Sequence, residues 1–347
     1  ANLPDPTIKL PNKHFDTLIW TGTGSSNAIT GLNFQPDFLW AKSRSQGYHH
    51  TLIDSARGTN KQLWADRNNE EQTDTSFLTS FNSNGVTLGD NSSGTGATNT
   101  NGHTYVGWFW KGGGTASSNS DGGITSSVSA NTSAGFSIIT WTGTGSAATI
   151  GHGLGVAPKW LVVKLRSGSQ DWFVNNGMIL NDLGKYYKLN SSGSSNASDT
   201  NVFPNTAPTS TVFSVGTDSA VNASGSTYIA YVFSEVEGYS KFTTYTGNGS
   251  TDGTFVYTGF TPTFMIQRKS SDENWHMMDT TRDPLNPNTL GIDPNLANAE
   301  ANDSNLSIDF LSNGFKLRTS HATANGSGTK YILLAFAESP FKNARAR

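Results

Sequence analysis

The chain has 347 residues, of which only 14% are charged, and its formal net charge is −3. It contains no basic cluster, which argues against a nucleic-acid partner, and no apolar run approaches the roughly 20 residues that a membrane-spanning helix needs. It also has no cysteine, so its stability must come from packed cores and interfaces rather than from disulfides.

The first elements predict an arm followed by a β-strand. Residues 1–14 are polar and contain proline, which predicts an arm that docks on another surface. Residues 15–20 are β-branched and aromatic and run into a Thr-Gly-Thr-Gly turn, where the glycines allow a sharp reversal.

This strand and turn recur along the chain. Successive copies are separated by about the length of one small domain, which predicts a tandem array of like modules rather than a solenoid. The copies are Trp20–Ser25, Trp141–Ser146 and Tyr245–Ser250.

Two further landmarks follow each copy in the same order. A proline opens an apolar run, which predicts a strand buried on both faces with the proline at its first residue, and a Tyr-led aromatic run closes the repeat. The proline-led runs are Pro36–Lys42, Pro158–Lys164 and Pro262–Arg268, and the closing runs are Tyr105–Trp110, Tyr228–Phe233 and Tyr331–Phe336.

These landmarks predict an all-β chain, a tandem array of three β-sandwich modules of a jelly-roll-like kind. The modules are residues 15–114 (repeat 1), 135–238 (repeat 2) and 239–347 (repeat 3). Residues 115–134 are mostly Gly, Ser, Thr and Asn, which predicts a linker, whereas repeat 2 passes into repeat 3 with none. We therefore expect repeats 2 and 3 to pack together and repeat 1 to be tethered more loosely.

Repeated apolar positions on the predicted strands give the expected core. These core candidates are Trp20, Phe38, Phe109, Trp160, Val162, Ile229, Phe233, Phe264, Ile266, Ile332 and Phe336.

Four segments of this sequence resemble the C-terminal repeats of virion proteins from marine tailed bacteriophages, including tail-fibre and virion structural proteins. The segments are Glu237–Phe242, Tyr245–Ser250, Asp309–Arg318 and Ala335–Phe341. The resemblance covers residues 135–343 and, less closely, 15–114, and repeat 1 departs from it at Lys111 and Gly112. It implies a host-facing or particle-decorating β module and carries no set of catalytic residues.

The resemblance leads us to expect a non-enzymatic virion protein located on the tail or the particle surface. Its expected partners are other virion proteins and a host cell-surface glycan or receptor, with neither nucleic acid nor membrane insertion, and we expect a homotrimer. Two alternatives remain open: a glycan-hydrolysing enzyme on a β-sandwich scaffold, and a capsid decoration protein without receptor binding.

The sequence gives little support to catalysis. Glu235 and Glu237 fall on one face of a predicted strand end and could act on a glycoside, but the favoured interpretation is a strand that becomes polar as it leaves its sheet. The histidines lack the spacing of metal ligands, and no nucleophile elbow or phosphate loop is present. We predict no catalytic residue, no metal and no cofactor.

Two Asp-x-x-Arg segments are candidate ligand contacts. Asp54 and Arg57 align with Asp279 and Arg282. An internal ion pair within a turn is the favoured interpretation of this spacing, and a ligand clamp is the alternative.

Aromatic residues and polar loops are the stronger indication of binding. Trp108 and Trp110 fall on one strand face, where exposed rings could stack on a sugar, although most large aromatics on strands are core residues. Asn222 and Asn325 lie in turn-rich loops, and loops on a rigid scaffold often carry recognition. The candidate loops are 89–102, 190–200, 217–226 and 320–329.

Overall fold

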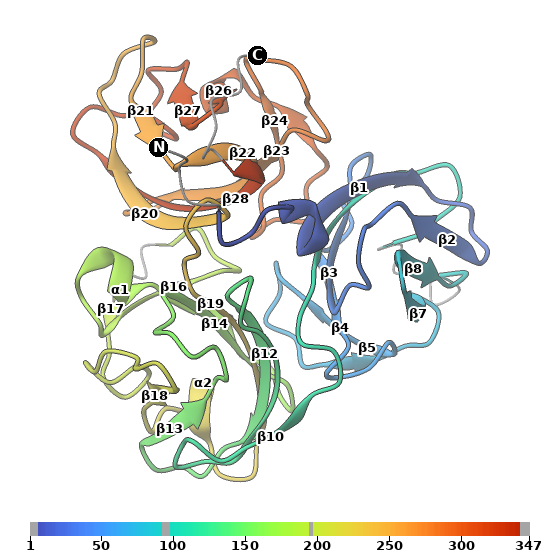
Figure 1. Ribbon diagram of the computed structural model, residues 1–347, viewed down its shortest axis with the longest axis vertical. Helices are drawn as coiled ribbons and strands as arrows, with labels where there is room; N and C mark the ends of the chain where they lie inside the picture. The colour runs from blue at the N-terminus through green and yellow to red at the C-terminus, as the bar shows by residue number, and fades with distance from the viewer. Residues whose placement is uncertain (1–5, 92–97, 194–196, 341–347) are drawn as a thin grey trace.

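The computed structural model describes residues 6–91, 98–193 and 197–340, and it consists mainly of antiparallel β-sheets. Three lobes surround a common centre, and each lobe contains one of the repeats found in the sequence (Figure 1). This confirms the predicted all-β class, while the jelly-roll assignment stays a prediction. The short helical turns are η1 (Pro11–Lys13), α1 (Gly177–Leu180), α2 (Ser219–Asn222) and η2 (Ser304–Leu306).

Repeat 1 forms a larger and a smaller sheet. In spatial order, the larger sheet contains β1 (Phe15–Thr21), β9 (Thr104–Trp110), β3 (Phe38–Ser43), β4 (Thr51–Asp54), β5 (Lys61–Trp64) and β6 (Gln72–Thr73). The smaller sheet contains β2 (Asn27–Thr30), β8 (Gly85–Leu88) and β7 (Leu78–Asn82).

Repeat 2 follows the same plan with a wider larger sheet. In spatial order this sheet contains β10 (Ser117–Asn119), β11 (Ser126–Asn131), β12 (Phe136–Thr142), β19 (Thr227–Phe233), β14 (Trp160–Leu165), β15 (Phe173–Asn175), β16 (Lys185–Lys188) and β17 (Ala197–Ser198). The smaller sheet contains β13 (Ala148–Gly151) and β18 (Val212–Val215).

The strands β10 and β11 correct the prediction that residues 115–134 are a linker. Both strands pair within the sheet of repeat 2. Their serines are compatible with a buried position because their hydroxyls have partners: Ser126 donates to the carbonyl of Gly151, and Ser129 donates to that of Gly114.

Repeat 3 repeats the plan once more. Its larger sheet contains β20 (Ser240–Thr246), β28 (Lys330–Pro340), β22 (Phe260–Lys269) and β23 (Trp275–Asp279) in spatial order. The smaller sheet contains β21 (Phe255–Tyr257), β27 (Gly314–Leu317) and β26 (Ile308–Leu311), and a short pair is formed by β24 (Leu290–Gly291) and β25 (Ala301–Asn302).

The larger sheets share the order of their central strands. In each, the motif strand pairs with the closing strand, which pairs with the proline-led strand. The register is also shared, because the aromatic residue of the motif always faces the tyrosine of the closing strand across the ladder. The three stacked pairs are Trp20–Tyr105, Trp141–Tyr228 and Tyr245–Tyr331.

The two faces of each larger sheet enter different cores. In β9, Phe109 joins a cluster made by repeat 1 alone, whereas Trp108 and Trp110 join a cluster to which all three repeats contribute. Alternate residues of β19 and β28 divide in the same way. We call the cluster in the centre the shared core. It explains why the strand runs are continuously apolar, since both faces are buried.

The shared core corrects the expectation that repeat 1 is loosely tethered. Phe38 of repeat 1 stacks on Tyr231 of repeat 2, with ring centroids 4.2 Å apart, and Phe15 stacks on Phe336 of repeat 3 at 5.1 Å. The core candidates predicted from sequence are all buried except Trp20, which is half-buried. Repeat 1 is therefore packed against both other repeats.

Main-chain hydrogen bonds join the repeats in a closed cycle. Glu71 of repeat 1 donates its N–H to Arg166 of repeat 2, and Glu300 of repeat 3 donates to Arg44 of repeat 1. Glu273 of repeat 3 donates in turn to the carbonyl of Ser192 in repeat 2. Each repeat thus bonds to both of its neighbours.

A buried cation is the penultimate residue of β3, of β14 and of β22, beside these junctions. Lys164 donates to the carbonyls of Asn68 and Leu165, and Arg268 donates to Ser191 at 2.9 Å. The third is Lys42, which donates to the carbonyl of Ser43 at 2.7 Å. Burial lowers the pKa of Lys42 and of Lys164 to about 8, and carbonyl oxygens solvate these ammonium groups in place of water.

Candidate functional site

The first Asp-x-x-Arg candidate lies inside the interface between repeats 1 and 2. Arg57 Nε donates to Asp54 Oδ2 at 2.6 Å, and the hydroxyl of Tyr231 donates to the same oxygen at 2.8 Å. Arg57 also contacts Glu71, which accepts two hydrogen bonds from Arg166. Asp54 and Arg57 are buried, so they join two repeats and offer no clamp at the surface.

The second candidate performs the same role between repeats 3 and 1. Asp279 pairs with Arg282 and accepts a hydrogen bond from Trp108 Nε1 at 3.1 Å. Arg282 also donates to Glu300, which pairs with Arg44 of repeat 1 at 2.8 Å. Burial alone would raise the pKa of Glu300, but the hydrogen bonds and charges of the two arginines outweigh it and hold the pKa below its usual value.

The two tryptophans proposed for sugar stacking are core residues. Trp108 is 0% exposed and Trp110 is 2% exposed, and both belong to the shared core. The strand alternation was predicted correctly, with both rings on one face of β9, but that face is covered by the other repeats. Their rings therefore pack on Phe264 of repeat 3 rather than facing solvent.

Asn222 and Asn325 anchor the repeated motif. The Oδ1 of Asn222 accepts the N–H of Thr144, and its Nδ2 donates to the carbonyls of Ser146 and Gly216. Asn325 makes the equivalent bonds in repeat 3, and Asn99 makes them in repeat 1. All three amides are buried, so they hold the loop from inside instead of contacting a ligand.

The same contact explains the first glycine of each motif. A Cβ atom on Gly22 would lie 2.2 Å from the carbonyl oxygen of Thr100, and on Gly143 it would lie 2.3 Å from that of Ala223. Only glycine allows the loop to approach the segment that carries the anchoring asparagine. The close approach of the two segments therefore accounts for the repeated glycine.

The remaining candidates form no catalytic arrangement in the described part of the chain. Glu235 accepts hydrogen bonds from the side chain of Lys241 and from the N–H of Phe242, while Glu237 is exposed. Among the described residues no group of three potential metal ligands occurs, and none of the helices described there is long and apolar enough to cross a membrane. Residues 92–97 and 194–196 of the candidate loops lie outside the described residues.

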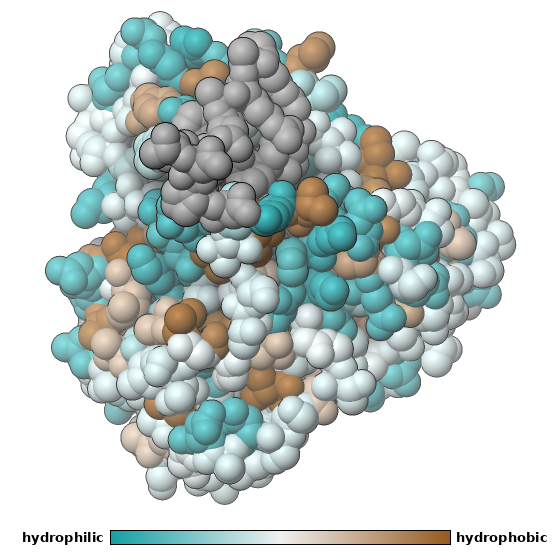
Figure 2. Space-filling model, in the orientation of Figure 1, coloured by the Kyte–Doolittle hydropathy of each residue, from teal (hydrophilic) through white to brown (hydrophobic). Residues whose placement is uncertain are grey.

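The surface offers two features that the sequence interpretation missed. On the face shown in Figure 2, hydrophobic residues appear in separate patches among hydrophilic ones. The first feature is an aromatic pair on β21, where Phe255 is 44% exposed and Tyr257 is 60% exposed, with Val256 buried between them. These rings project from the outer face of the smaller sheet of repeat 3.

Charged side chains border the aromatic pair. Lys316 lies opposite Phe255 on the neighbouring strand and pairs with Asp252 at 2.6 Å. Arg318 pairs with Asp309 and lies 3.7 Å from Asp252. The lysine and its hydrogen bond lower the pKa of Asp252. We call Phe255, Tyr257 and these four charged residues the aromatic patch.

The other repeats have no aromatic residues at these positions. The ladder registers place Ile29, Ile150 and Val256 at one equivalent position, each facing the interior. The residues on either side are Ala28 and Thr30 in repeat 1, Thr149 and Gly151 in repeat 2, and Phe255 and Tyr257 in repeat 3. The sequence signal for this aromatic pair is the Phe-Val-Tyr alternation at residues 255–257. It is short and lies between turn-forming residues.

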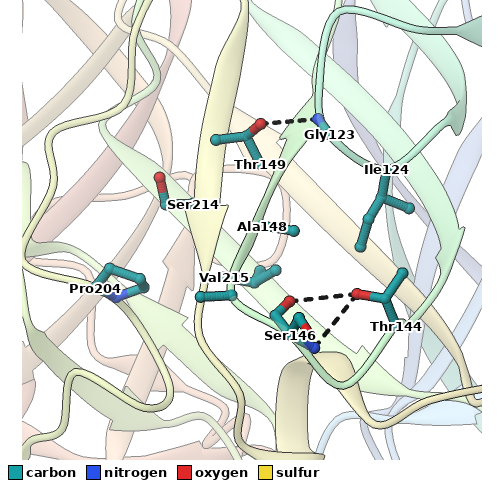
Figure 3. A pocket seen from close by; sticks show the side chains of 10 residues that line it. Gly123, Ile124, Thr144, Ser146, Ala148, Thr149, Pro204, Ser214 and Val215 are labelled. Carbon is teal, nitrogen blue, oxygen red and sulfur yellow. Dashed lines mark hydrogen bonds between the residues drawn. The ribbon is translucent and has the colours of Figure 1, made fainter.

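The second feature is an open pocket of about 570 Å³ in repeat 2. Figure 3 shows the hydroxyls of Thr144, Ser146, Thr149 and Ser214 around it, with Ile124 and Pro204 as apolar walls. A hydrogen bond from the N–H of Gly123 to Thr149 Oγ1 closes one side. The pocket therefore lies where the connection between β10 and β11 meets strand β13.

Comparison with known proteins places the chain by family alone. No curated protein and no solved structure matches it. One family matches residues 10–340, a span that includes all three repeats. The matched span thus takes in all three lobes, and the chain belongs to the family described as Domain of unknown function (DUF7483).

Proposed function

We propose that this chain is a non-enzymatic structural module of a bacteriophage virion, part of a tail fibre or of the particle surface. The observation that supports it best is the interlocking of three repeats around one shared core. The arginines and aspartates that could do chemistry join the repeats, as the Asp54–Arg57–Tyr231 cluster does. A body held together in this way is suited to carry load and present surfaces.

Within this proposal each repeat is a β-sandwich module of a jelly-roll-like kind. The pairing of a larger with a smaller sheet around a private core in every repeat supports it. The homotrimer stays a prediction. Within one chain, the larger sheets of the three repeats already bury one face against each other in the shared core. Light scattering tests the homotrimer: three times 37.0 kDa supports a trimer, and a single chain mass overturns it.

Purified particles test the virion role. We expect the protein in stoichiometric amounts in washed particles, with cryo-EM density for a three-lobed body on the tail or surface. Its absence from particles, together with release of reducing ends from host polysaccharide by the purified chain, would favour the glycan-hydrolysing alternative.

Host-surface carbohydrate recognition is a second candidate function, and the aromatic patch favours it. Sugars pack their C–H faces on aromatic rings and hydrogen-bond to neighbouring carboxylates and guanidinium groups. Adsorption of labelled protein to host cells tests this. We expect Tyr257→Thr to reduce adsorption at least tenfold, and Thr30→Ala, at the equivalent position of repeat 1, to leave it unchanged; equal adsorption by both variants would contradict it.

A further inference from the structure

Among the described residues, no strand lies along one edge of β21. It is the outer strand of its sheet, and in the described part of the chain it pairs with β27 alone. Leu317 donates its N–H to the carbonyl of Thr254, and Thr258 donates to that of Asn313. Because bonded and non-bonded positions alternate in an antiparallel ladder, Val256 bonds to β27, and the N–H and C=O groups of Phe255 and Tyr257 point outward.

The chain itself covers the equivalent edge in repeat 2. Strand β13 is the counterpart of β21, and Thr149 is the counterpart of Phe255. Ile124 donates its N–H to the carbonyl of Thr149 at 3.1 Å and forms a parallel bridge with Ile150. The N–H of Gly123 bonds to Thr149 Oγ1, as drawn in Figure 3. A segment from outside the smaller sheet therefore docks on this edge in an extended form, through one parallel bridge at Ile124.

The covering segment shows what such an edge accepts. Ile124 is 7% exposed and buries its side chain in the core of repeat 2. A Cβ atom on Gly122 would lie 2.4 Å from the carbonyl oxygen of Thr149, so the main chain approaches this closely only at glycine. The docked sequence is thus glycine followed, two residues later, by a β-branched apolar residue.

The side chains of β21 do not protect its edge. Exposed edge strands are commonly guarded by lysine, proline or a bulge, which discourage pairing with other chains. β21 instead exposes Phe255 and Tyr257, whose rings would flank an added strand. A sugar on these rings would leave the outward N–H and C=O groups without peptide partners, whereas a strand would satisfy the groups and cover the rings.

We propose that the free edge of β21 binds an extended polypeptide segment of a neighbouring protein by strand addition, in the parallel orientation that residues 122–124 adopt on β13. The segment carries glycine two residues before a β-branched apolar residue. That the neighbour is a virion protein rests on the proposed function, whereas the strand addition rests on the geometry of β21. Main-chain hydrogen bonds supply the affinity, and the aromatic rings select the segment.

A peptide copied from the chain provides the probe. The peptide Asp-Gly-Gly-Ile-Thr-Ser-Ser reproduces residues 121–127, and a control peptide replaces its isoleucine with aspartate. We expect saturable binding of the first peptide to the full chain, with amide exchange at Phe255 and Tyr257 slowed at least tenfold, and no effect of the control. Unchanged exchange at these two amides in saturating peptide would overturn the proposal.

Variants at one position separate the main chain from the ring. Phe255→Ala removes the ring and keeps the outward N–H, so it should weaken peptide binding only in part. Phe255→Pro removes the N–H as well, yet leaves Val256 free to bond to β27, so it should abolish binding. Tyr257→Pro repeats the test at the other outward residue if Phe255→Pro disturbs the fold. Ala28→Pro, on the equivalent edge of repeat 1, should bind the peptide normally.

The outcomes distinguish this inference from the proposed function. Equal binding by the alanine and proline variants, both well folded, would contradict strand addition. Loss of host-cell adsorption in both variants without any peptide binding would instead assign the patch to carbohydrate. Absence of the protein from virions would overturn the virion role and leave peptide binding in solution as it was.

Discussion

At the residue scale, small buried polar groups set the geometry of this protein. Asn99, Asn222 and Asn325 each form hydrogen bonds to the main chain of a motif loop from its buried side. In each Asp–Arg pair at the interfaces, the two charges neutralise each other. Removing one partner of such a pair lowers the free energy of unfolding, because the other partner is left buried and unpaired. Their positions are therefore sensitive points of the fold.

Asn222→Ala should lower the free energy of unfolding by about 3 kcal/mol, because it leaves the carbonyls of Ser146 and Gly216 and the N–H of Thr144 without their partner. Urea titration followed by fluorescence measures the change. Thr144→Ala, on the exposed side of the same loop, should change stability by less than about 0.5 kcal/mol. Similar losses in both variants would show that the buried amide is not the anchor.

His50 should make the protein sensitive to acid. It is fully buried, and burial followed by the charge of Lys42 lowers its pKa from 6.5 to about 3. A depressed pKa in the folded state gives stability that is present above pH 6.5 and lost as the pH falls. Between pH 6.5 and about pH 5, this group should remove about 2 kcal/mol.

The measurement is urea unfolding of wild type and His50→Gln across this pH range. Glutamine retains polar atoms that can face Trp40 Nε1 and the carbonyl of Asp293, which contact the ring nitrogens of His50. The variant should show a shallower decline than wild type. Parallel pH profiles would mean that other groups cause the acid sensitivity.

At the element scale, the repeats differ in what lies beside the outer strand of the smaller sheet. The larger sheets share the order of their central strands, but the smaller sheets end differently: β13 is covered by residues 122–124, while β21 exposes an aromatic pair. The third counterpart, β2, carries Ala28 and Thr30 at its outward positions. The outer strand of the smaller sheet thus differs in its surroundings from repeat to repeat.

Ile124→Ala should cost about 2–5 kcal/mol, because the side chain fills the core of repeat 2 at the sheet edge. Ile124→Val, which removes one methyl group, should cost about 1 kcal/mol. Amide exchange at Ile124 should accelerate in the alanine variant, since its N–H is the one bonded to Thr149. Unchanged exchange would show that the edge is held by the serines of β11 instead.

Sequence patterns predicted the features that depend on residues close together in the chain. Continuous apolar runs such as residues 38–41 predicted burial on both faces, and the spacing of Asp54 and Arg57 predicted an internal ion pair, which the structure contains. The further partner of Asp54 is Tyr231, 177 residues away. No local pattern identifies such a partner, because it depends on how the repeats meet.

The missed features share a physical reason. Residues 115–134 have the composition of a linker, and their serines become strand residues only through hydrogen bonds to Gly151 and Gly114. Trp108 and Trp110 were assigned to one face correctly, but whether that face meets solvent or another repeat is a property of the assembled molecule. The aromatic pair on β21 becomes informative only when its counterparts in the other repeats are aligned by ladder register.

At the scale of the whole molecule, three repeats share one core, and their junctions close a cycle. Trp110 of repeat 1 contacts Phe136 and Phe233 of repeat 2 and Phe264 and Phe336 of repeat 3. Removing its side chain therefore withdraws contacts from every repeat at once. Trp110→Ala should lower the free energy of unfolding by about 3–5 kcal/mol.

The central claim, that the three repeats are one cooperative body, is tested most directly by pulsed amide exchange during urea titration, read separately for peptides of each repeat. We predict one common midpoint for all three repeats in the wild type, and an equal downward shift of all three midpoints in Trp110→Ala. Three separate midpoints in the wild type, or a shift confined to repeat 1 in the variant, would contradict this account.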